Sequence, residues 1–216
     1  MDKRPDILAE HYQKTFELTL KFWESRNRTF LLLLFVIGLG TLLTFKANQA
    51  DSLLIDFIAG FLKIEDSNRI NELRLTFPYS LMQSILLVVI FYLMVQLFHR
   101  TNSINRNYDY LGKMEKEIRL ELWGKPCLDT ISFTRESEHY IKSQQPLKKF
   151  IKYSYTGILG LLLVAFLGMR IISDFKAQNY ITVIADVLIS IPIFIFYLGY
   201  AFPDAWLVKL LSKKSA

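Results

Sequence analysis

The chain has 216 residues, 52% of them hydrophobic and 14% aromatic, with a mean hydropathy of +0.25 and a formal net charge of +6. Soluble domains contain about 45–50% apolar residues on a count that includes glycine, and this chain exceeds that level without its glycines. The excess lies in four long blocks, which predicts an integral membrane protein rather than a soluble domain. A single cysteine excludes an internal disulfide and a cysteine-based zinc site.

Four apolar blocks are candidate membrane spans, each close to the length of about 17–25 residues with which a helix crosses a bilayer. The first two blocks contain no charged residue, and Pro78 stands just before the second, where the start of a helix tolerates proline. The third block contains Arg170 and Asp174 near its end, and the fourth contains Asp186 and Pro192. Because the first block follows a charged, helix-like segment, we expect a retained span rather than a cleaved signal peptide. The transmembrane helices are predicted at residues 29–45, 80–98, 153–175 and 180–202.

The positions of the basic residues predict the orientation of these spans. Of the 26 Lys and Arg residues, 20 lie in residues 1–28, in residues 99–152 or after residue 202. Since loops rich in Lys and Arg stay in the cytoplasm, both termini and the region 99–152 are predicted to be cytoplasmic. The predicted location is the cell (inner) membrane, with residues 46–79 on the outer face and residues 203–216 as a cytoplasmic tail.

Two helices are predicted beside the spans. Residues 1–28 form a cytoplasmic pre-helix, because apolar residues recur at helical spacing and no proline or glycine separates them from the first span. It is either an amphipathic helix on the inner leaflet or the cytoplasmic start of one long helix. Residues 51–64 carry one broad apolar face but are too short to span easily, so an interfacial or re-entrant helix is predicted there. The outer segment 46–79 is thus expected to be an ordered cap.

The region 99–152 is predicted to be a small helical cytoplasmic domain. If its first helix continues the second span without a break, the helix over residues 81–123 would measure about 65 Å at about 1.5 Å per residue. Its apolar residues form a near-heptad seam in which Glu115 fills the remaining position. The seam either packs against a helix of the same chain or joins copies of the chain, or a partner, in a coiled coil. The seam consists of Ile104, Tyr108, Leu111, Ile118 and Leu122.

The second half of this cytoplasmic domain begins at the Gly-Lys-Pro sequence of residues 124–126, which ends the first helix. A second helix is predicted to begin near Thr134, and Pro146 interrupts it before the third span. Three lysines at the start of that span anchor the topology, and near a charged membrane surface each would bind anionic lipid headgroups with about 1 kcal/mol. These are Lys148, Lys149 and Lys152.

Charged and polar side chains inside the spans form the candidate functional site. Arg170 and Asp186 stand at nearly equal distances from the turn between the third and fourth spans, so they are predicted to pair at matching depth near the outer boundary. Pairing lowers the free energy of burying each charge in a membrane. The pair either clamps the hairpin or lines a polar pathway or gate, unless Arg170 extends alone to the interface. Gln83 and Gln96 of the second span are predicted to face protein, because an amide in lipid needs a partner.

Small residues in the spans predict close packing between helices. They are Gly38 and Gly40 in the first span and Gly160 and Gly168 in the third. The sequence leaves open whether this packing joins helices of one subunit or of two. Together with the seam, the glycines predict a homo-oligomer.

The sequence contains none of the common enzyme motifs. It lacks the phosphate-binding, dinucleotide-binding and nucleophile-elbow motifs and the paired histidines of a metalloenzyme. We therefore predict no enzymatic activity, no metal site and no cofactor. Orientation in the membrane explains the positive charge, so no direct nucleic-acid binding is expected. The expected partners are membrane lipids, further copies of the chain and a cytoplasmic protein.

The predicted layout is a pre-helix, a span, an outer segment and a second span, followed by the sequence NYDYLGKMEKEIR at residues 107–119. This layout and this sequence carry a resemblance to known proteins. The chain resembles small helical membrane proteins of prokaryotic antiphage and CRISPR-associated systems, namely SLATT-type effectors and the four-span membrane subunit of Kiwa-like systems. It departs from SLATT proteins, which usually have two spans. The resemblance implies a membrane effector or infection sensor with a cytoplasmic partner, and it carries over no functional residue.

Two functional hypotheses follow. The first is an oligomeric, channel-like membrane effector, in antiphage defence, that perturbs or gates membrane permeability in response to a cytoplasmic signal or partner. The alternative is a non-conducting membrane sensor or anchor subunit that recruits a cytoplasmic partner protein to the inner membrane. A transporter is disfavoured, because four spans without a detectable repeat are unusual for that class.

Overall fold

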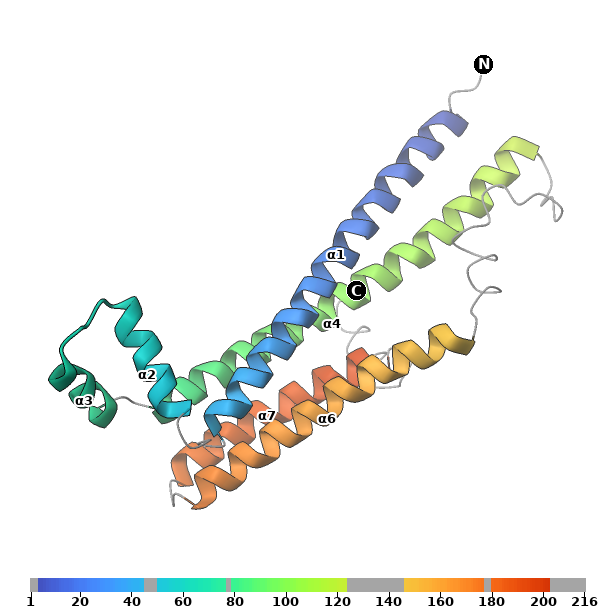
Figure 1. Cartoon of the computed structure of the whole chain (residues 1–216). Helices are drawn as coiled ribbons and strands as arrows, with labels where there is room; N and C mark the ends of the chain where they lie inside the picture. Colours follow the sequence, from blue (N-terminus) through green and yellow to red (C-terminus); the bar gives the residue numbers. More distant parts are fainter. Residues whose placement is uncertain (1–3, 45–49, 77–78, 124–145, 177–179, 203–216) are drawn as a thin grey trace. The chain divides into compact units, whose positions relative to one another are not determined.

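The computed structural model describes residues 4–44, 50–76, 79–123, 146–176 and 180–202, and all regular structure in these ranges is α-helix (Figure 1). The predicted all-α class is thus confirmed for this part of the chain. Four of the helices are long and apolar enough to cross a membrane, namely α1, α4, α6 and α7. In chain order the helices are α1 (Arg4–Thr44), α2 (Ala50–Phe61), α3 (Ser67–Thr76), α4 (Tyr79–Trp123), α6 (Pro146–Lys176) and α7 (Tyr180–Ala201).

Helices α1 and α4 each join a predicted span to a predicted cytoplasmic segment without a break. Helix α1 has 41 residues, so the pre-helix is the start of one long helix. Threonines along α1 donate to the carbonyl four residues earlier, as Thr19 does to Thr15 at 2.8 Å, which satisfies their hydroxyls inside the helix. Helix α4 has 45 residues and measures about 68 Å, so the second predicted span and the segment up to Trp123 form one continuous helix.

Helices α6 and α7 contain the third and fourth predicted spans. Pro146 is the first residue of α6, and the preceding helix that it was expected to interrupt lies outside the described residues. Proline fits there because the first amides of a helix have no partner in the helix. Pro192 lies inside α7 and removes one backbone hydrogen bond, which a helix in a membrane tolerates when its neighbours compensate. The helix predicted near Thr134 lies outside the described residues.

The outer segment contains two helices where the sequence predicted one. Asp66 begins α3, because its carboxylate accepts a hydrogen bond from the Asn68 amide at 2.9 Å and so caps the helix. Helix α2 ends in a Schellman motif, in which the Ile64 amide donates to the Ala59 carbonyl at 2.8 Å. Lys63 takes the left-handed position of that motif, with a φ of 55°. α3 was missed because its sequence is polar and has no apolar periodicity.

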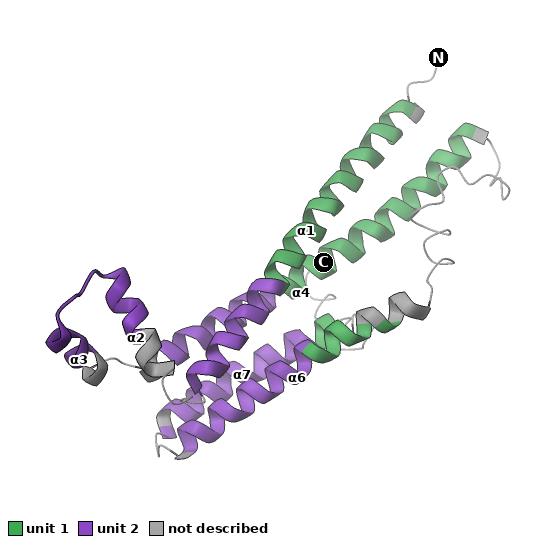
Figure 2. Ribbon diagram, viewed as in Figure 1, with its two compact units in different colours: residues 1–30, 96–158, 198–216 green, residues 31–95, 159–197 purple. Residues whose placement is uncertain are grey.

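The chain divides into two compact units (Figure 2). Unit 1 comprises residues 1–30, 96–158 and 198–216, and unit 2 comprises residues 31–95 and 159–197. The described buried apolar residues of unit 2 come from α1, α2, α4, α6 and α7, with Leu33, Ile37, Leu87, Ile90, Leu159 and Leu163 among them. The span boundaries predicted within these helices stay predictions.

Two of the four glycines named above sit where the packing is tight. A Cβ atom on Gly40 would lie 2.8 Å from the Phe166 ring, and one on Gly160 would collide with the Tyr197 hydroxyl. Gly38 and Gly168, in contrast, have no other side chain within 4 Å of such an atom. Close packing within one chain therefore accounts for Gly40 and Gly160 alone.

Candidate functional site

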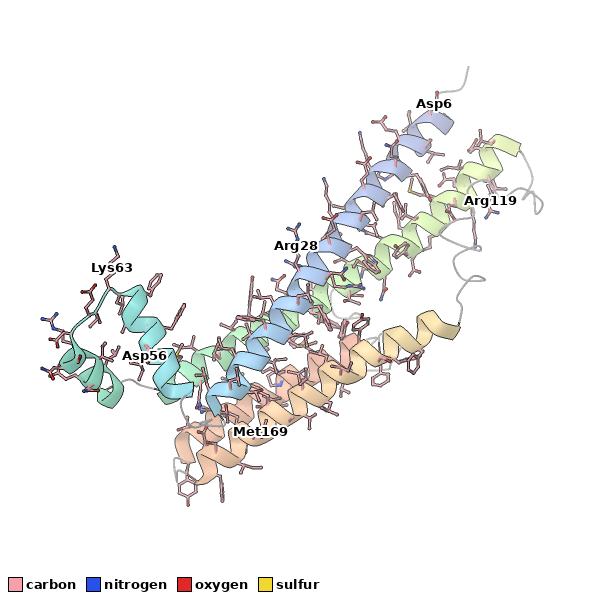
Figure 3. All side chains as sticks on the ribbon, viewed as in Figure 1. Asp6, Arg28, Asp56, Lys63, Arg119 and Met169 are labelled. Atoms are coloured by element: carbon pink, nitrogen blue, oxygen red, sulfur yellow. The ribbon has the colours of Figure 1, made fainter. Side chains whose placement is uncertain are left out.

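The charged pair expected between the third and fourth spans is in contact within unit 2. Arg170 on α6 donates through Nε to Asp186 Oδ2 on α7 at 2.7 Å. Each residue is only 1% exposed. The short connection between α6 and α7 brings the two residues to the same level, because they lie at similar distances from it. Arg170 follows Met169, which Figure 3 labels on α6.

A second carboxylate joins the pair from the same helix as the arginine. Asp174 lies one turn beyond Arg170 on α6, with Oδ2 placed 3.0 Å from Arg170 Nη2, and it is buried. The sequence shows Asp174 near the end of the span, but Asp174 was not included in the predicted pair. The spacing of four residues was the available signal, because side chains at that spacing are neighbours on a helix.

Helix α4 provides the uncharged partners of the arginine. Arg170 Nη1 donates to Gln83 Oε1, and Arg170 Nη2 lies 3.5 Å from Ser84 Oγ. The amide nitrogen of Gln83 in turn donates to the Leu43 carbonyl at 3.0 Å. Leu43 is in the last turn of α1, where carbonyls have no partner in the helix. One network of side chains thus connects α1, α4, α6 and α7.

We call Arg170, Asp174, Asp186, Gln83 and Ser84 the Arg170 cluster. It holds one guanidinium and two carboxylates, so its formal charge is −1. Burying a charge in apolar surroundings is unfavourable unless partners satisfy it, and the guanidinium has partners on three helices. Chemically, the cluster fixes the relative level of four helices and offers carboxylate oxygens to a proton or a cation.

The remaining predicted polar positions lie apart from this cluster. Gln96 is on α4, about 20 Å along the helix axis from Gln83, and it belongs to unit 1. It is half-buried. Lys148, Lys149 and Lys152 lie in the first turns of α6, and their side chains are outside the described part of the structure. Their role at lipid headgroups stays a prediction.

The near-heptad seam on α4 is largely buried within unit 1. Ile104, Leu111 and Ile118 are buried, Tyr108 is half-buried, and Leu122 is exposed. Glu115, in the remaining position of the seam, is also buried and accepts a hydrogen bond from the Tyr12 hydroxyl of α1 at 3.1 Å. This favours the alternative that the seam packs against a helix of its own chain. The predicted homo-oligomer therefore gains no support from the seam.

A row of polar contacts between α1 and α4 in unit 1 was not anticipated from the sequence. Along this row the residue numbers rise on α1 while they fall on α4, so the two helices run antiparallel there. Because each pair lies far apart in the chain, only the fold identifies it. The contacts are His11 Nε2 with Tyr110 Oη at 3.0 Å, Tyr12 with Glu115, Asn107 Nδ2 to Thr19 Oγ1 at 3.1 Å, and Arg100 Nη1 to the Ser25 carbonyl at 2.7 Å and to Thr29.

In the described ranges, no three His, Cys, Asp or Glu side chains gather as a metal site. Comparison of the chain with known protein families, with curated proteins and with solved structures finds no match. The function is therefore inferred from the residues of this chain.

Proposed function

We propose that this protein is a multi-pass integral membrane protein in which α1, α4, α6 and α7 are the spans. The four helices meet the length and apolarity that crossing requires. Each also exposes large apolar side chains in unit 2, which lipid would remove from water. Examples are Leu31, Phe35, Ile85, Val88, Leu161 and Leu188. The distribution of Lys and Arg supports an orientation in which both termini lie on the cytoplasmic side of the inner membrane.

Within that membrane, the proposed function is to change the permeability of the bilayer, with the Arg170 cluster as the gate. The observation that supports it is the second carboxylate. A structural clamp needs one acid for one arginine, and the pair of Arg170 and Asp186 provides it. Asp174 adds a formal negative charge to a buried site, which makes the site less favourable as a mere clamp. Charged groups inside a membrane commonly mark ion pathways.

Unit 1 is the proposed receiver of the cytoplasmic signal or partner. Helices α1 and α4 belong to both units and are continuous through each. A rearrangement of the polar contacts between these helices in unit 1 would therefore act on segments that also contribute to unit 2. Gly38 and Gly168, which face open space in the single chain, support the oligomeric form of the proposal. Mass photometry in mild detergent tests it, and particles of monomer mass alone would contradict it.

Ion flux from liposomes tests the gate. Asp174→Asn removes the excess negative charge and leaves Arg170 paired with Asp186. Because the cluster is then neutral and attracts cations less, we expect cation flux to fall several-fold below that of the wild type while the protein stays folded. Asp109→Asn is the matched control, since it makes the same chemical change at an exposed position of α4. Wild-type liposomes no leakier than empty ones, with no change in Asp174→Asn, would contradict the proposal.

A non-conducting sensor or anchor is the second candidate. Apolar side chains exposed on the cytoplasmic parts of α1 and α4 support it, because a partner protein would cover them. They include Leu18, Leu20, Leu120 and Leu122. A wild type without flux that still retains a cytoplasmic protein at the membrane would favour this candidate.

Antiphage defence is the proposed setting, and the resemblance of residues 107–119 is its support. Phage plating on bacteria that express the wild type or Asp174→Asn tests it. We expect protection by the wild type and weaker protection by the variant. Equal plating on both strains and on cells without the protein would contradict the setting.

A further inference from the structure

Helix α2 presents an apolar face that no described part of the chain covers. Phe57 and Phe61 are one turn apart on that face and are 74% and 80% exposed, and Leu62 beside them is also exposed. The other side of α2 is different, because Ile55 and Ala59 are buried there. Helix α2 packs against α3, so among the described residues one side of the helix has a partner and the other is open. Figure 3 shows this pair of helices, with Asp56 and Lys63 labelled.

The connections of this helix pair restrict what can cover the apolar face. Residues 45–49 join α1 to α2, and a fully extended connection of that length reaches about 20 Å. Residues 77–78 join α3 to α4 and reach about 10 Å. The end of α1 and the start of α4 are the same-side ends of two proposed spans. The pair is therefore tied at both ends to one surface of the bilayer.

The dimensions and polarity of the pair fit that surface. Helix α2 has 12 residues and measures about 18 Å, which is too short for the hydrocarbon core of about 30 Å. It therefore lies along the membrane rather than across it. The exposed side chains in the described part of α3 are polar, and they include Asn68, Arg69, Asn71 and Glu72. One helix of the pair is thus suited to lipid and the other to water.

We infer that α2 lies in the outer membrane interface, with Phe57, Phe61 and Leu62 inserted among the lipid chains and α3 on the aqueous side. The occupant of the apolar face is the lipid surface itself. Lys63 follows the inserted face, and its long side chain reaches the headgroups while its stem stays in apolar surroundings. The inference rests on the proposed membrane spans.

Fluorescence quenching of the full-length protein in liposomes tests the inference. Cys127→Ser removes the single cysteine, and Phe57→Cys or Phe61→Cys then carries an environment-sensitive label. We expect lipids brominated near the headgroup to quench both labels several-fold more than aqueous iodide does. Asn71→Cys on α3 is the matched control and should show the reverse order. All three positions are exposed, so the substitutions leave the packed side of the helices unchanged, and a thermal melt verifies this.

A label at Leu161, an exposed position of α6, separates the inference from the proposed spans. Quenching of Leu161→Cys by lipid, with Phe57→Cys and Phe61→Cys open to iodide, would overturn the interfacial helix and leave the spans intact. Access of iodide to all three labels would overturn the spans as well. Disulfide-linked dimers of Phe57→Cys, shielded from both quenchers, would show that a second copy covers the face instead of lipid.

Discussion

The two units of this protein use polar side chains differently. Unit 1 joins α1 to α4 through separate, mostly uncharged contacts, such as Asn107 with Thr19. Unit 2 instead gathers a guanidinium and two carboxylates around Arg170 in its buried interior. A single hydrogen bond contributes about 0.5–1.5 kcal/mol to stability, because water competes for both groups. A buried ion that loses its partner destabilises by about 3–5 kcal/mol.

The difference agrees with the separate tasks proposed for the units. Each contact of unit 1 costs little free energy to break, as the proposed rearrangement by a cytoplasmic signal requires. The Arg170 cluster resists change one residue at a time, because its other members all contact the same guanidinium. Few discrete arrangements rather than gradual loosening are therefore expected of it, as the proposed gate requires.

Arg170→Gln is expected to have the largest effect on stability, because it leaves two buried carboxylates without their cation. The free energy of unfolding in detergent should fall by about 3–5 kcal/mol. Arg28→Gln is the control at an exposed position, where a change within about 0.5 kcal/mol is expected. Equal unfolding midpoints for the two variants would show that the cluster does not hold the helices together.

The two acids of the cluster should behave differently from each other. Asp186→Asn removes the carboxylate that accepts from Arg170 Nε at 2.7 Å, and a loss of about 1.5–3 kcal/mol is expected for a charge-assisted hydrogen bond. Asp174→Asn removes the excess charge, so its effect on stability should be smaller and its effect on flux larger. Denaturation and flux measured on the same preparations would test this order. A larger loss of stability in Asp174→Asn would mean that Asp174 is part of the clamp.

A charge swap sharpens the same comparison. Arg170→Asp alone places three carboxylates together, so it should be far less stable than the double variant that also carries Asp186→Arg. Restoration is expected to be partial, since the new carboxylate at position 170 lies one turn from Asp174 on the same helix. Identical stability of the single and double variants would show that the two sites do not interact.

Tyr12→Phe is the corresponding test in unit 1. It removes the hydroxyl that donates to the buried Glu115, so we expect a loss of about 1–2 kcal/mol, smaller than that of Arg170→Gln. Gln13→Ala is the control on the same helix, where only an exposed contact to Glu17 is lost. A loss as large as that of Arg170→Gln would remove the distinction between the units.

Much of the fold was predictable because long apolar helices leave a strong pattern in the sequence. Long apolar blocks with few or no charges located the four apolar helices, and equal distances from the connection after α6 indicated the contact of Arg170 with Asp186. Less could be predicted about partners on other helices. Gln83 was recognised as a side chain in need of a partner, but its bonds to Arg170 and to the Leu43 carbonyl depend on the packing of three helices.

The row of contacts in unit 1 was not predictable for the same reason. The residues of each pair lie far apart in the sequence, as Tyr12 and Glu115 do, and polar side chains on a helix usually face water. Glu115 itself interrupts an apolar seam, which was the one local indication of a buried polar partner. The seam indicated a packed face correctly, but periodicity alone does not identify the helix that packs on it.

The smallest expected effect concerns the end of α2, where backbone geometry alone is at work. Lys63 has a φ of 55°, a conformation that costs a residue with a side chain about 1 kcal/mol and costs glycine almost nothing. Lys63→Gly should therefore stabilise the Schellman motif by about 0.5–1 kcal/mol, and Lys63→Ala should not. Global unfolding is a poor measure of so local a gain, so hydrogen exchange of the Ile64 amide, which donates to the Ala59 carbonyl, is the measurement of choice. Slower exchange in Lys63→Gly alone is the expected result. Slower exchange in both variants would point to the lysine charge as the cause, and faster exchange in Lys63→Gly would show that the lysine side chain holds this helix end against the membrane interface.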